Sequence, residues 1–106
     1  MAGTIGVKPQ TRWSAASWLF AWVLNDISAT VQDVATARKL QEIVRVNLGW
    51  LGVGDLPEAG RAEVLDALCR SLVDDGNRKL PAGLPNREEV LGYLRELARL
   101  ACDSRK

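Results

Sequence analysis

The sequence predicts an all-α protein, a single-domain antiparallel or orthogonal bundle of about four helices, on the basis of three observations. Apolar residues recur every three or four positions in four separate segments, which is the period of an amphipathic helix. Residues typical of helix ends flank these segments. No segment shows the sustained alternation of apolar and polar residues that predicts a half-buried strand. A chain of 106 residues is long enough to bury a core of its own.

The first helix is expected to begin near Trp13, so that residues 1–12 form an N-terminal arm and residues 13–106 form the helical domain. Almost every residue from Trp13 to Leu24 is apolar, whereas a surface helix needs an apolar face of only about 100°. We therefore expect this helix either to lie at the centre of the fold or to contact another chain. The run is shorter than the roughly 20 residues of a membrane span, and no convincing cleavage site follows it, so a membrane location is not expected.

The second helix is expected over residues 31–48, with a capping signal at its start. It is followed by GWLGVG at residues 49–54, which has the glycine content of a phosphate-binding loop. However, the glycines are in the reverse order of the dinucleotide motif, a helix precedes them, and no Lys-Ser or Lys-Thr follows them. We interpret the stretch as a turn in which Gly49 ends one helix and Asp55 begins the next.

The third helix is expected over residues 56–73, and the fourth from Asn86 to about Asp103. The fourth helix has an apolar arc of roughly 200°, about twice the minimum for a surface helix. The stretch at residues 74–86 is interpreted as the longest connection of the chain. Long connections are more often functional than short ones, which makes it a plausible contact surface.

The two cysteines are expected to be free thiols. If the third and fourth helices form an antiparallel hairpin, Cys69 lies near its loop end and Cys102 at the far end. At a rise of about 1.5 Å per residue they would be more than about 10 Å apart, beyond the roughly 7 Å that a disulfide allows. Unpaired thiols fit a cytoplasmic location.

The composition argues against catalysis and against cofactor or metal binding. The chain has no His, which removes the commonest general base and the commonest metal ligand. Acidic residues are scattered over polar helix faces, and the adjacent Asp74 and Asp75 are interpreted as solubilising residues at a helix end. We expect no enzyme activity, no cofactor, no metal and no small-molecule substrate. The formal net charge of +1 provides no overall field that attracts nucleic acid or an anionic membrane.

The favoured function is a non-catalytic protein-binding module, because two helices carry more apolar surface than so small a domain can bury. The Arg- and Ala-rich composition suggests a bacterial protein, and immunity proteins, antitoxins, inhibitors and adaptors are of this size and class. The partner is expected to be another protein, such as a toxin or an effector, or a second copy of the chain. Aromatic residues are frequent interface anchors, and the expected contact residues are Trp18, Phe20, Trp22, Trp50, Tyr93 and Leu100.

Two alternatives remain open. Taken individually, Trp18 and Trp22 are more simply explained as core residues. A homo-oligomeric structural protein or a nucleic-acid-associated regulator is the alternative function, since Arg38, Lys39 and Arg45 lie on the second helix. Charges of both signs alternate along the other helices, which is typical of a solvated face, so nucleic acid and membrane are the less favoured partners.

Overall fold

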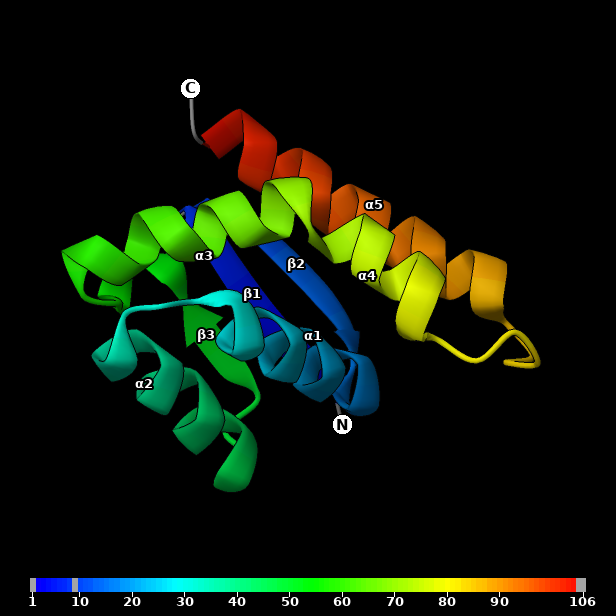
Figure 1. Cartoon of the computed structure of the whole chain (residues 1–106), viewed down its shortest axis with the longest axis horizontal. Coiled ribbons are helices and arrows are strands. Elements are labelled where there is room, and N and C mark those ends of the chain that lie inside the picture. Colours follow the sequence, from blue (N-terminus) through cyan, green and yellow to red (C-terminus); the bar gives the residue numbers. More distant parts are fainter. Residues whose placement is uncertain (1, 9, 105–106) are drawn as a thin grey trace.

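The computed structural model describes residues 2–8 and 10–104, and it shows an α/β fold (Figure 1). Three strands form one sheet in the order β2-β1-β3, in which β1 is antiparallel to β2 and parallel to β3. The elements in chain order are β1 (Ala2–Lys8), β2 (Thr11–Ala16), α1 (Ser17–Thr30), α2 (Val34–Arg45), β3 (Trp50–Gly52), the 3-10 turn η1 (Val53–Asp55), α3 (Glu58–Arg70), α4 (Leu72–Lys79) and α5 (Arg87–Ser104).

The predicted all-α bundle is wrong because residues 2–8 and 11–16 form a pair of antiparallel strands instead of an arm and the start of a helix. Ile5 and Trp13 are paired across β1 and β2, and both are buried. Thr4 and Ser14 are paired on the opposite face, where their hydroxyl oxygens lie 2.9 Å apart. The alternation typical of a strand is therefore present. Residues 1, 9 and 105–106 of the predicted arm and helical domain lie outside the described residues.

Small residues conceal this alternation in the sequence. Gly3 and Ala15 are paired on the same face as Ile5 and Trp13, but they contribute almost no side chain to the apolar pattern. Gly3 is required by packing, since a Cβ atom at this position would lie 2.1 Å from Cγ of Phe20. The glycine thus lets the first turn of α1 pack directly on β1.

The helices cover one face of the sheet. Ile5, Trp13 and Leu51 point into the core from the three strands, and each is at least 97% buried. α1 and α5 contact β1 and β2 directly, and α3 and α4 pack beside α5 (Figure 1). The opposite face of the sheet is open and carries Ser14 and Trp50. None of the described helices combines the length and hydropathy needed to cross a membrane.

α2 ends three residues earlier than predicted. Asn47 adopts a left-handed conformation with φ 54°. The N–H of Leu48 donates to the carbonyl of Ile43, and the N–H of Asn47 donates to that of Val44, each at 3.1 Å. This pair of bonds is the Schellman arrangement that closes a helix end. Gly49 is also left-handed, with φ 74°, but the GWLGVG stretch then forms β3 and η1 and is more than a turn between helices.

The predicted third helix is interrupted at Ser71, and the chain continues as α4 to Lys79. Residues 74–86 are therefore only partly a connection. Gly76 of α4 is buried, and a Cβ atom there would lie 2.6 Å from Cδ1 of Leu94 in α5. The absence of a side chain at Gly76 allows α4 to lie against α5.

The presence of α4 between α3 and α5 also overturns the prediction that the two cysteines are free thiols. Because α4 carries the hairpin on to Lys79, Cys69 lies far from the connection and opposite Cys102. The two Cα atoms are 4.9 Å apart and the sulfurs form a disulfide. The disulfide joins α3 to the last turns of α5.

Candidate protein-binding surface

The solvent-exposed side of α1 carries no charged residue. Asp26 is the only charged residue of this helix, and it is buried together with the apolar residues that face the core. The exposed and half-exposed positions are uncharged, and two of them are tryptophans. We call this surface the α1 face, and its residues are Ser17, Trp18, Ala21, Trp22, Asn25, Ser28 and Ala29.

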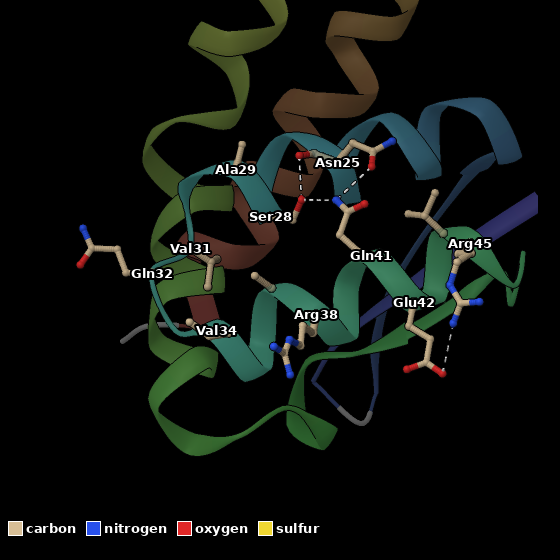
Figure 2. A pocket seen from close by; sticks show the side chains of 12 residues that line it. Asn25, Ser28, Ala29, Val31, Gln32, Val34, Arg38, Gln41, Glu42 and Arg45 are labelled. Atoms are coloured by element: carbon tan, nitrogen blue, oxygen red, sulfur yellow. Dashed lines mark hydrogen bonds and ion pairs between the residues drawn. The ribbon is translucent and has the colours of Figure 1, made fainter.

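α2 lies beside α1 and forms a groove with it, which we call the α1–α2 groove (Figure 2). Its volume is about 980 Å³. Apolar side chains from both helices and from the connection between them form much of the lining: Ala29, Val31, Val34, Ala37 and Val44. Arg38, Glu42 and Arg45 lie along the α2 side, where Arg45 and Glu42 form an ion pair of 4.0 Å.

A small hydrogen-bond network ties the two helices together across the groove. The side-chain nitrogen of Gln41 donates to the amide oxygen of Asn25 at 3.2 Å and to the hydroxyl of Ser28 at 2.5 Å. The Ser28 hydroxyl in turn donates to the backbone carbonyl of Asn25 at 3.0 Å. Figure 2 shows these side chains meeting between α1 and α2. The polar residues of the α1 face therefore hold the groove in shape.

The start of α2 is anchored by the rest of the molecule. The carboxylate of Asp33 accepts a bond from the backbone N–H of Thr36 at 3.1 Å, as a helix N-cap does. From α3, the carboxylate of Glu63 accepts bonds from the backbone N–H groups of Gln32 and Asp33, each at 2.9 Å. Gly60 of α3 packs directly against Thr36, where a Cβ atom would lie 1.7 Å from the hydroxyl. α2 is thus held in a defined position beside α1.

The large exposed apolar side chains of the described residues lie mostly in one segment of the sequence. Single exposed apolar residues are normal, but here their distribution is uneven. Of the six large ones, five lie between residues 18 and 50, the segment of α1, α2 and β3, and only Tyr93 lies elsewhere. The five are Trp18, Val34, Val46, Leu48 and Trp50. The sequence analysis did not predict contacts at Val34, Val46 or Leu48. Val34 is the first residue of α2, and Val46 and Leu48 follow its last residue.

The structure places three of the predicted contact residues on α1, with different outcomes. Trp18 is 46% exposed on the α1 face. Trp22 lies one turn later on the same face and is half-buried against the core. Phe20 points the other way and is buried against Gly3, so it is not accessible to a partner.

The other three predicted residues are dispersed. Trp50 lies on the open face of the sheet, where the Arg12 guanidinium stacks 5.5 Å from its ring centre. Tyr93 is exposed on α5, and its backbone carbonyl accepts a bond of 2.9 Å from the Trp13 indole. Leu100 is half-buried against the core. The six residues therefore do not form one surface, and Trp18 and Trp22 are the pair that the fold brings together.

Two buried carboxyl groups were missed by the sequence analysis. Asp26 of α1 and Asp75 of α4 are each 6% exposed, so Asp75 is not a solubilising residue at a helix end. The Lys79 ammonium lies 2.8 Å from Asp26, and Arg78 pairs with Asp75. Burial raises the pKa of Asp26, the neighbouring Asp75 raises it further, and Lys79 opposes the shift. The hydrogen bond to Asp26 raises the pKa of Lys79.

This charged cluster fits a structural role, because it joins α4 to α1 and neither carboxylate lines the α1–α2 groove. Within the described part of the chain, no group of three or more acidic or cysteine side chains is placed to hold a metal ion. No family model, curated protein or solved structure matches the sequence or the fold. The case for a function therefore depends on the surface of the protein itself.

Proposed function

We propose that the protein is a small non-catalytic protein-binding module that contacts its partner through the α1 face and the adjoining α1–α2 groove. The observation that supports this most directly is the absence of charge from the exposed side of a helix that carries Trp18 and Trp22. Interface centres are depleted of charged residues and enriched in aromatic ones, and tryptophan is among the most frequent energetic anchors.

A protein partner fits this surface better than a small molecule or a nucleic acid. The groove is open and lies between two helices, and Gln41 already bonds Asn25 and Ser28 across it. Arg38 and Arg45 line it, but Glu42 lies between them and pairs with Arg45, so the surface offers no continuous basic strip for phosphates. The partner of such a module is either a toxin or an effector protein, as for a bacterial immunity protein, antitoxin, inhibitor or adaptor of this size, or a second copy of the chain.

The proposal is tested by affinity capture from the native host with matched aromatic substitutions. Trp18→Ala removes an aromatic side chain from the α1 face, and Tyr93→Ala removes a similarly exposed one from α5. We expect Trp18→Ala to lower recovery of a stoichiometric partner at least 10-fold and Tyr93→Ala to leave it unchanged. Equal recovery with both variants would place the contact elsewhere. Loss of binding with a steep dependence on salt would instead indicate a nucleic-acid partner.

The cytoplasmic location remains a prediction, and the cysteines no longer support it. It was expected from free thiols, whereas Cys69 and Cys102 form a disulfide, and disulfides persist mainly in oxidising compartments. The redox state of the two cysteines in the host cell is measured by acid quenching followed by alkylation with a heavy maleimide. Two added labels without prior reduction would support the cytoplasm, and none would support an oxidising compartment.

A further inference from the structure

We propose that the partner of the α1 face is a second copy of this chain. In this dimer, the α1–α2 hairpins of two molecules, each made of residues 17–45, pack together about a two-fold axis. This inference rests on the proposed function and names the partner of the same surface. It follows from the lack of charge on the α1 face, from its hydrogen-bonding groups, from the charge pattern of α2 and from the position of α2 in the molecule.

A two-fold interface places each residue near the axis beside its own copy, so a charged residue there meets a like charge. Among the helices of the described residues, α1 alone has no charge on its exposed side. The exposed side of α5, by comparison, carries Glu88, Arg95 and Glu96. The α1 face is therefore the helical surface that meets its own copy without electrostatic cost.

The polar groups of the α1 face are complementary to themselves. Ser hydroxyls and Asn amides both donate and accept hydrogen bonds, whereas carboxylates only accept and ammonium groups only donate. The amide oxygen of Asn25 accepts from Gln41, and no hydrogen bond within the described residues uses its amide nitrogen. Figure 2 shows this nitrogen pointing away from Gln41. The donor is available to an acceptor of a second molecule, including the hydroxyl of that molecule's Ser17 or Ser28.

The edge of the surface has a charge pattern that also matches itself. Arg38, Glu42 and Arg45 follow one another at helical-turn spacing along α2. A two-fold axis perpendicular to α2 reverses the direction of the second molecule's α2. A displacement of one turn then places Glu42 of each copy beside an arginine of the other, so the edge pairs opposite charges while the centre stays uncharged.

The position of the hairpin leaves room for this packing. α2 lies at the margin of the molecule, against α1 and β3 (Figure 1). Two such hairpins stacked face to face, α1 on α1 and α2 on α2, make a four-helix bundle in which the α1 face is covered. Helices of 12 and 14 residues are only about 18 to 21 Å long at 1.5 Å per residue. The interface is therefore at the small end of specific contacts, and we expect dissociation in the micromolar range.

Sedimentation velocity between about 1 and 300 μM tests the inference, and this range brackets the micromolar dissociation expected for a small interface. The parent is expected to move from the monomer mass of 11.6 kDa towards twice that value. Asn25→Asp keeps the oxygen that Gln41 bonds but adds a negative charge to the α1 face, and Ala21→Glu adds one a turn earlier. Both are expected to weaken association at least 10-fold. The matched substitution Asn86→Asp, on the exposed connection before α5, is expected to leave association unchanged.

A thiol placed on the α1 face locates the contact directly. No described cysteine is free, so Asn25→Cys introduces a single reactive thiol. We expect mild oxidation to cross-link this variant much faster than Asn86→Cys at equal concentration. Unchanged circular dichroism of each variant establishes that folding is not the cause of a difference.

Three results would overturn the inference. They are a parent that stays monomeric at 300 μM, a dimer that all the substitutions leave intact, and cross-linking that is equal at residues 25 and 86. A monomeric parent whose Trp18→Ala variant still loses a host protein would refute self-association and leave the protein-binding function standing. A monomeric parent whose capture is insensitive to Trp18→Ala would refute both.

Discussion

Removal of the Cys69–Cys102 disulfide is expected to destabilise the protein strongly without changing its fold. The two cysteines are 33 residues apart in the sequence. In the chain-entropy description, closing a loop of that length stabilises the folded state by about 3.7 kcal/mol. With a urea m value of about 1.5 kcal/mol per M for a domain of this size, the unfolding midpoint should fall by about 2.5 M.

The assay compares urea unfolding of the oxidised parent, the parent reduced with a phosphine, and the Cys69→Ser/Cys102→Ser variant. The reduced parent and the variant should have similar midpoints, and adding the phosphine to the variant should change nothing. A midpoint shift below about 0.5 M in protein that mass spectrometry shows to be fully reduced would refute the entropic reasoning. Reaction of the untreated protein with two equivalents of a thiol reagent under denaturing conditions would refute the pairing itself.

Three further predictions concern packing and charge. Burial raises the pKa of Asp26 above 3.8, so the folded protein holds this proton more tightly than the unfolded chain, and the stabilisation is lost as pH rises through the folded pKa. Urea titrations should therefore show that the stability of the parent relative to Asp26→Asn falls from pH 4 to pH 7. Gly60→Ala should destabilise by about 1–3 kcal/mol, since a Cβ would overlap Thr36. Glu63→Ala should cost about 1.5–3 kcal/mol, since it leaves the backbone N–H of Asp33 without its charged acceptor.

Each of these has an outcome that contradicts it. A constant difference between parent and Asp26→Asn across the pH range would mean that Asp26 titrates normally. For Gly60→Ala the control is Gly92→Ala in α5, where a Cβ meets nothing within 4 Å and better helix propensity should give up to about 1 kcal/mol of stabilisation. Equal effects of the two substitutions would exclude a steric cause. Full stability of Glu63→Ala would show that water replaces the carboxylate.

α2 and α5 were predictable from the sequence, whereas α4 and the sheet were not. α2 and α5 have one apolar stripe opposite a charged side, and both were expected close to where they occur. The hairpin of β1 and β2 escaped detection because Gly3 and Ala15 occupy inward positions. An apolar run that includes Trp13 then looks like part of the helix that follows it. β3 has only three residues and exists through its pairing with β1, which is a long-range contact that no local pattern reveals.

The excess apolar surface expected of the first helix was partly an effect of the missing sheet. With β1 and β2 beside it, α1 buries Phe20 and Val23 as well as Leu24 within its own chain. The number of apolar residues in α1 therefore no longer implies a partner. What still supports a partner is that the solvent-facing side of α1 carries no charge. A helix that needed only solubility would carry Arg or Glu there at little cost in free energy, as α3 and α5 do. Trp18 in such a position forgoes hydrophobic stabilisation within the monomer, and the proposed burial against another protein surface would recover it.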